Sequence, residues 1–367
     1  MMWLGLAGCS TEVDLIAPYD SFPVVYGLLE LDADTQWVKI NRTWLGEGDN
    51  REAAMIPDSS EYPSGAVIAR IVELNPSSSG QILGNELPTG NVWALRDTVL
   101  FNKSTEGSFF GPNQRVYFAS TTSEALSEDK WYRLELELPN GRTAQATTTM
   151  IQGSGSSVNY PPNLNSVFQM DFATINNGVP TYQEPIFRWT TAPGASLYTA
   201  SLVVHFVEKF YADPFWTSLD SVRERSIRIG MGSRPVGTSP DMEQTFNTER
   251  LYTELASRLE VNPRVRRELG VFDEEVQKER AFDFELQIAN RDLATYLDVN
   301  ESAISIVQDR PLWTNVQGGI GLWGARSTTG VYGWGYRKQT IQHLQESDLT
   351  AALNFCSPSP FSDYSCQ

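Results

Sequence analysis

Hydrophobic and polar side chains alternate along much of this chain, and the clearest alternation lies at 131–138. Its hydrophobic members are Tyr132, Leu134, Leu136 and Leu138. A period of two places them on one face of a strand and the polar side chains on the other. Asn140-Gly141 follows directly, and this pair suits the positive φ angles of a type I′ turn. The pattern therefore predicts a β-hairpin over 131–149.

Short runs of strand type precede this hairpin and are separated by turn-like residues. They lie at 24–29, 37–40, 66–74, 93–101 and 115–119. About seven strands without a convincing helix are typical of an immunoglobulin-like β-sandwich. We predict such a sandwich over residues 22–151. A linker is predicted over 152–165, because residues 153–157 are all Gly or Ser and Pro161-Pro162 follows them.

A second β domain is predicted over 166–345. Trp189 lies in a strand-like run, Pro193-Gly194 marks a turn, and Tyr198 leads a strictly alternating run. These features resemble the early strands of fibronectin type III domains, which implies a fibronectin type III-like sandwich. Strand character returns at 282–288. The predicted fold class is therefore mainly β, with two β-sandwich domains.

A small helical insertion is predicted within the second domain, at about 247–280. Asn247 or Thr248 suits its N-cap, and one helix face carries Leu251, Leu255 and Leu259. This apolar face favours a helix that covers the sandwich, and a helix that binds a partner is the alternative. Residues 346–367 are predicted to form a C-terminal tail.

Composition and charge limit the possible ligands. The chain of 367 residues carries 45 acidic and 28 basic residues, a formal net charge of −17. Such a surface repels phosphate backbones, so nucleic acid is not an expected partner. Aromatic residues make up 11% of the chain. Their rings fill sandwich cores or form binding platforms, and composition does not separate these two uses.

The N-terminus carries the one membrane signal. Leu6-Ala7-Gly8-Cys9 looks like the lipobox of bacterial lipoproteins, in which the cysteine thiol receives a diacylglycerol. The acyl chains then contribute about 0.8 kcal/mol per buried CH₂ group to membrane binding. Residues 1–21 are predicted to hold a signal remnant, this lipobox and a tether, with Cys9 as the lipidation site. Only eight residues precede Cys9 and none is basic, so an upstream start or an ordinary buried cysteine remains the alternative.

The other two cysteines, Cys356 and Cys366, are predicted to form a disulfide. An oxidising compartment favours pairing of an even number of thiols, and free thiols are the alternative. Closing so short a loop contributes roughly 2–3 kcal/mol to stability in the chain-entropy model. Zinc is a weak rival because a structural site needs four ligands and His343 is the only nearby imidazole.

No catalytic, metal or cofactor motif stands out in the sequence. The histidines, His205 and His343, belong to neither a zinc-protease motif nor a nucleophile-elbow motif. The glycine-rich residues 318–324 lack the Gly-Lys-Ser/Thr ending of a phosphate loop. Carboxylate pairs for glycoside hydrolysis cannot be chosen without distances. The protein is therefore predicted not to be an enzyme.

One cluster of aromatic and arginine residues is a candidate ligand platform. Aromatic faces beside guanidinium groups suit a glycan or a peptide, and the alternative is that the rings close the core of the second domain. The residues of this cluster are Trp313, Trp323, Arg326, Tyr332, Trp334, Tyr336 and Arg337.

Three segments, at 23–29, 38–46 and 313–324, resemble outer-membrane lipoproteins of unknown function that are common in Bacteroidota. The last segment contains Asn-Val-Gln-Gly-Gly-Ile-Gly at 315–321. The resemblance implies a lipid-anchored protein of the outer membrane, often encoded beside TonB-dependent transporters. We therefore expect a non-enzymatic binding or accessory subunit, possible partners being a β-barrel outer-membrane protein and a glycan or peptide ligand. The alternatives are a structural or assembly component of an outer-membrane machine and a surface hydrolase acting on glycans.

Overall fold

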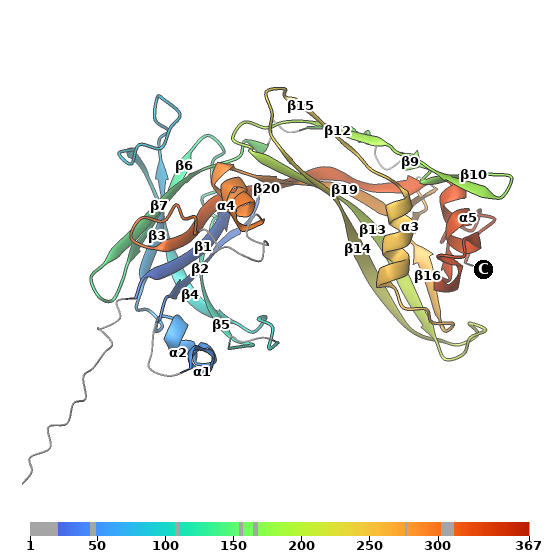
Figure 1. Ribbon diagram of the computed structural model, residues 1–367, viewed down its shortest axis with the longest axis horizontal. Coiled ribbons are helices and arrows are strands. Elements are labelled where there is room, and N and C mark those ends of the chain that lie inside the picture. The colour runs from blue at the N-terminus through green and yellow to red at the C-terminus, as the bar shows by residue number, and fades with distance from the viewer. Residues whose placement is uncertain are drawn as a thin grey trace, which may run out of the picture.

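The computed structural model describes residues 21–44, 49–106, 110–153, 157–163, 168–275, 277–301 and 312–366. The predicted lipidation site, Cys9, lies outside the described residues. The chain is mainly β, with 48% strand and 13% helix, which confirms the predicted fold class. Figure 1 shows two lobes, with β1–β7 in one and β12–β19 in the other, joined through strand β20 (Ile320–Tyr336).

The first lobe is a β-sandwich of two sheets. One sheet has the order β1-β2-β5-β4 and the other the order β4-β3-β6-β7, so that β4 contributes to both. This is the strand order of the seven-stranded immunoglobulin sandwich. Two short helices, α1 (Asn50–Ala54) and α2 (Pro57–Ser60), lie between the second and third strands. The strands are β1 (Pro23–Leu29), β2 (Thr35–Arg42), β3 (Ile68–Leu74), β4 (Pro88–Leu100), β5 (Gln114–Ser120), β6 (Trp131–Glu137) and β7 (Thr143–Thr149).

The predicted hairpin at 131–149 is confirmed as β6 and β7. Tyr132, Leu134 and Leu136 are buried in the core of the first sandwich. Gly141 has a positive φ of +78° but Asn140 does not, so the turn is not the predicted type I′ turn, which needs a positive φ at both residues. The Tyr132 hydroxyl accepts the Ser127 N–H at 2.6 Å and lies 3.2 Å from the Ser127 carbonyl oxygen. A tyrosine held in this way at the start of the sixth strand is a hallmark of immunoglobulin-like domains.

Strand β20 belongs to both lobes. Residues 320–325 pair in parallel with β1, and residues 326–334 pair antiparallel with β19 (Phe282–Ala289). Trp323 is accordingly buried in the core of the first sandwich, whereas Trp334 is buried in that of the second. The predicted division, with 166–345 in the second domain, is therefore corrected, because residues 320–325 belong to a sheet of the first lobe. Local alternation identifies a strand but does not say which sheet edge it joins.

The second lobe is also a β-sandwich. A sheet of order β8-β12-β15 faces a sheet of order β14-β13-β19-β20. Trp189 and Tyr198 are both buried, with ring centroids 5.8 Å apart. The remaining strands of these sheets are β8 (Ser157–Tyr160), β12 (Ile186–Thr190), β13 (Leu197–Tyr211), β14 (Leu219–Pro235) and β15 (Asp241–Thr245).

The predicted linker at 152–165 is wrong at its centre. Residues 157–160 form β8, which pairs antiparallel with β12. Tyr160 packs edge-on against Phe187, at a centroid distance of 6.1 Å. Only this tertiary contact shows that the segment after the Gly/Ser run enters a sheet, because its own composition is that of a loop.

The predicted insertion at 247–280 is helical only in α3 (Glu249–Arg258). Leu251, Leu255 and Leu259 are all buried against the second core, so the apolar face covers the sandwich as expected. The rest of the segment is corrected to short strands. In the first of them, alternate side chains are buried, a period of two. These strands are β16 (Val265–Leu269), β17 (Val271–Asp273) and β18 (Lys278–Arg280).

The predicted C-terminal tail is an integral part of the second lobe. Its strand β21 pairs in parallel with β16, and Cys356 forms a disulfide with Cys366 across a Cα–Cα distance of 5.1 Å. This confirms the predicted disulfide. The other elements of this lobe and its junction are β9 (Gln169–Met170), β10 (Ala173–Asn176), β11 (Val179–Tyr182), α4 (Arg291–Glu301), α5 (Lys338–Glu346), the 3₁₀ helix η3 (Ala351–Leu353) and β21 (Phe355–Cys356). Among the described residues, no helix combines the length and apolar character needed to cross a membrane.

Candidate functional site

The predicted ligand platform does not form one surface. Trp323 lies in the core of the first sandwich, and Trp334 and Tyr336 lie in the core of the second. These three are buried, in agreement with the alternative that the rings close a core. Tyr332, Arg326 and Arg337 are exposed, and Trp313 is partly buried beside helix α4.

A groove lined by aromatic side chains lies between helix α4 and strands β1 and β2. We call it the aromatic groove, and its volume is about 390 Å³. Two of its rings are open to solvent, since Tyr26 is 43% exposed and Trp37 is 45% exposed. The other lining residues used below are Leu28, Glu30, Leu293, Tyr296 and Arg326.

Strand alternation and a close helix contact position this groove. Val25 and Leu29 of β1 point into the core, so Tyr26 and Leu28 lie on the opposite face of the strand. Helix α4 packs onto that face because residue 324 is glycine. A Cβ at Gly324 would meet Leu28 Cδ2 at 3.3 Å and Leu293 Cβ at 3.5 Å. Glycine thus leaves just enough room for the helix to lie close to the strand, and even a methyl group would fit tightly against Leu28.

Neutral hydroxyl groups and one ion pair add polar character to the aromatic groove. The rings of Tyr26 and Tyr296 meet edge-on at 6.0 Å. Burial, together with the hydrogen bond between the Tyr26 and Tyr296 hydroxyls, raises the pKa of Tyr26 to about 12, and the phenol is protonated at physiological pH. Arg326 forms an ion pair with Glu30 at the groove. An apolar hollow with a few fixed polar groups suits a ligand that carries an apolar side chain on a polar backbone.

Neither Tyr26 nor Trp37 was singled out by the sequence analysis, although a signal was present. In residues 37–40, Val38 and Ile40 occupy the buried positions, which places Trp37 on the outward face. An aromatic residue at an outward position of a half-buried strand marks an exposed ring. An exposed aromatic ring is therefore found by asking which alternate positions of a strand face outward, and not by counting aromatic residues in a segment.

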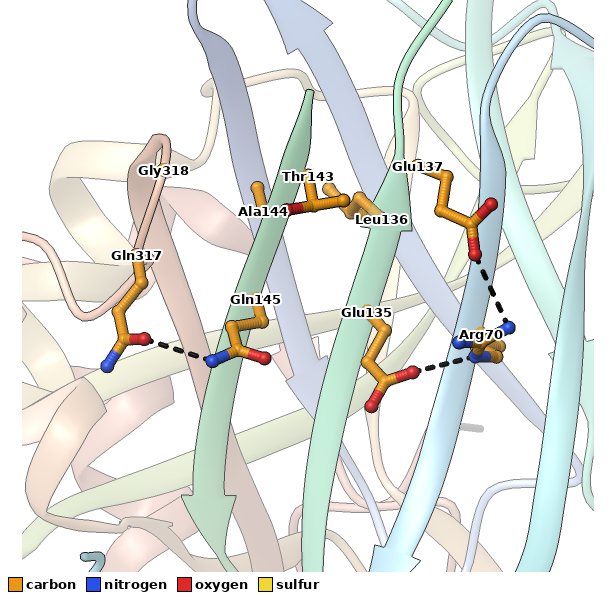
Figure 2. A pocket seen from close by; sticks show the side chains of 9 residues that line it. All are labelled: Arg70, Glu135, Leu136, Glu137, Thr143, Ala144, Gln145, Gln317 and Gly318. Carbon is orange, nitrogen blue, oxygen red and sulfur yellow. Dashed lines mark hydrogen bonds and ion pairs between the residues drawn. The ribbon is translucent and has the colours of Figure 1, made fainter. Parts of the chain in front are cut away.

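A second, polar hollow lies on the outer face of β3, β6 and β7, and Figure 2 shows its side chains in a row across the strands. Arg70 Nε lies 2.7 Å from Glu135 Oε2, and the Gln145 amide donates to Gln317 Oε1 at 3.0 Å. Register makes this row continuous, because Arg70, Glu135, Gln145 and Gln317 are successive cross-strand neighbours. We call these four residues the polar ladder.

His205 takes part in a hydrogen-bonded row that sequence spacing could not show. Its Nδ1 lies 2.7 Å from Ser226 Oγ on β14, and its Nε2 lies 2.7 Å from Asp283 Oδ2 on β19. Asp283 also accepts the Gly333 N–H at 2.7 Å. Both ring nitrogens thus have partners on the outer face of the second sandwich. This agrees with the interpretation of His205 as a strand residue with satisfied hydrogen bonds.

His343 lies inside the second lobe, between α5, α3 and β11. It is 5% exposed, its Nε2 lies 3.1 Å from the Tyr182 hydroxyl, and its ring meets that of Tyr252 at 4.5 Å. Burial lowers the pKa of His343, and the charge of Glu346 opposes this only in part. The folded protein therefore favours the neutral imidazole.

Stability is expected to fall as the pH drops through about 6.5, the pKa of an unfolded histidine. Below that pH the unfolded chain binds a proton that the buried His343 resists, so unfolding becomes easier. Urea denaturation of wild type and His343→Gln between pH 7.5 and 5.5 measures this, and the decline should be smaller in the variant. An equal decline in wild type and His343→Gln would refute this role.

Within the described ranges, no group of three or more His, Cys, Asp or Glu side chains is arranged to hold a metal ion. No protein-family model matches the chain, and no curated protein matches it in sequence. The aromatic groove and the hollow over the polar ladder are therefore the candidate sites of function.

Proposed function

We propose that the protein is a non-enzymatic lipoprotein of the cell envelope that binds a polypeptide partner through the aromatic groove. In this proposal Cys9 carries the lipid anchor at the outer membrane. The partner implied by the sequence resemblance is a β-barrel transporter of the TonB-dependent class. The observation that carries the proposal is the open groove of Tyr26, Trp37 and Tyr296 beside α4.

The chemistry of the groove favours a polypeptide. Its volume of about 390 Å³ falls at the low end of ligand pockets and suits one or two apolar side chains. The Tyr26 phenol and the Arg326–Glu30 pair offer a donor and charged partners for the backbone that carries those side chains. Exposed Tyr and Trp rings contribute large contact areas at protein interfaces.

Capture of the partner from native membranes tests the proposal. Wild-type protein, solubilised in mild detergent through its own anchor, is expected to retain a β-barrel transporter. Tyr26→Ala should reduce the retained amount at least roughly tenfold, the effect of losing an interface anchor of more than about 1.4 kcal/mol. Tyr332→Ala is the matched control, because Tyr332 is 53% exposed and lies on the far half of β20.

The outcomes separate the alternatives. Wild-type protein that is recovered alone and monomeric would overturn the proposal. Equal losses in both tyrosine variants would exclude the aromatic groove as the contact. A partner retained by both variants would favour a structural component that uses another surface. Intact mass of the native protein tests the anchor, since removal of the residues before Cys9 and added acyl mass are both required.

A further inference from the structure

The polar ladder forms one end of a longer hollow. The hollow over the ladder has a volume of about 430 Å³ and shares Gln145 and Gln317 with a neighbouring hollow of about 270 Å³. That hollow in turn shares Ile82 and Asp292 with a third, of about 720 Å³. The three are therefore contiguous. They run from the outer face of the first sandwich to the start of α4, and we call them together the polar groove.

The polar groove is charged but electrically balanced. Its lining contains three arginines, Arg70, Arg133 and Arg291, and three carboxylates, Glu135, Glu137 and Asp292. Several are paired to one another, with Arg70 and Arg133 each 2.7 Å from Glu135. In a chain of net charge −17, a long neutral groove does not attract or repel ions as a whole. It therefore fits an uncharged ligand.

The side chains of the ladder present planar hydrogen-bonding groups on a rigid support. A guanidinium, a carboxylate and two amides each offer two atoms in one plane, which suits bidentate contacts to neighbouring hydroxyl groups. They stand on adjacent strands, so the row spans about 14 Å from three inter-strand spacings. An uncharged ligand that offers hydroxyl groups over such a length is a glycan chain.

The far end of the groove adds an aromatic ring and an anchored carboxylate. Trp313 lines the largest hollow, half-buried beside Tyr296 at a centroid distance of 6.4 Å. Asp292 is held by a hydrogen bond of 2.8 Å from Thr148. The apolar faces of sugar rings pack on aromatic rings, while carboxylates accept from hydroxyl groups. Of the seven residues predicted as a platform, Trp313 alone lines the polar groove.

We infer that the polar groove is a binding site for an uncharged linear glycan, distinct from the aromatic groove on the other side of α4. The ladder contacts successive sugar units through Arg70, Glu135 and Gln145. Trp313 packs against a sugar ring at the other end.

Calorimetric titration of the full chain with cellohexaose, maltohexaose, xylohexaose and mannohexaose tests the inference, with hexagalacturonate as the charged probe. At least one neutral hexasaccharide is expected to bind, and more tightly than hexagalacturonate. Gln145→Ala and Trp313→Ala should each weaken that binding roughly tenfold, the loss expected for about 1.4 kcal/mol of contact free energy. Gln287→Ala is the matched control, an exposed strand glutamine on the second lobe.

Three results would overturn the inference: no neutral hexasaccharide binds, the charged probe binds best, or the groove variants bind like wild type. Tyr26→Ala should leave glycan binding unchanged, since Tyr26 lines only the aromatic groove among these hollows. Loss of glycan binding and loss of partner capture are therefore measured on separate variants. If the glycan site is refuted, the test of partner binding still stands, and the reverse also holds.

Discussion

Replacement of Trp323 by alanine is expected to lower the free energy of unfolding by about 3–5 kcal/mol, the range for large core aromatics. The indole is fully buried, and its Nε1 donates to the Tyr132 carbonyl oxygen at 3.0 Å. It also fills the space beside Gly27, where a Cβ would lie 2.6 Å from the ring. The substitution removes this packing and leaves a buried carbonyl without its donor. Guanidinium denaturation followed by circular dichroism measures the loss.

Trp37→Ala is the matched control for this experiment. Trp37 lies in the same sheet, on β2 and two strands away from Trp323, but it is 45% exposed. Its replacement is expected to change stability by less than about 1 kcal/mol, as for most partly exposed positions. If both variants lost the same amount, the assignment of Trp323 to the core of the first sandwich would be wrong.

Glu208→Ala is expected to destabilise the second lobe by about 3–5 kcal/mol, the effect of removing one partner from a buried ion pair. Glu208 and Arg267 are each 2% exposed, and Arg267 Nε lies 3.0 Å from Glu208 Oε1. Arg225 approaches the same carboxylate at 3.2 Å. Arg267 would keep its bonds to two backbone carbonyl oxygens but lose its counter-charge. Thermal unfolding of Glu208→Ala and of Glu224→Ala, an exposed control on β14, measures the difference.

A double variant separates loss of a pair from loss of packing. Glu208→Leu with Arg267→Met removes both charges and retains apolar volume, so much of the lost stability should return. A double variant as unstable as Glu208→Ala would show that the side chains matter through their shape or through other contacts of Arg267.

Elements whose partners lie close in sequence were predictable. The hairpin at 131–149 carries its alternation and its Asn-Gly turn within one segment. Helices α4 and α5 were not predicted, because each depends on contacts with strands that lie far away in the sequence. Asn290, whose side chain accepts the Leu293 N–H at 3.1 Å at the start of α4, is itself held by Thr148 and Thr149 of β7.

The candidate sites were less predictable than the fold. The predicted platform consisted of aromatic and arginine residues that lie close together in the sequence. Neighbouring residues of a strand point to opposite faces, however, and β20 passes from one core to the other. Trp323 and Trp334 therefore lie in different sandwiches. The aromatic groove combines residue 26 with residue 296, and the polar ladder combines residue 70 with residue 317. Such pairs become neighbours only once the sheet order is known.

Strand β20 joins the two lobes as one continuous strand. Its first residues are hydrogen-bonded into one sandwich and its last residues into the other, with no loop between them. A large rotation of one lobe against the other would strain the backbone hydrogen bonds of β20 with β1 and β19, whereas a flexible linker would only bend. A force on a ligand bound to the first lobe would therefore be transmitted to the second lobe through β20, in which no loop has to be extended first. The backbone of β20 would carry part of any tension between the lobes, together with the other segments of the chain that pass from one lobe to the other.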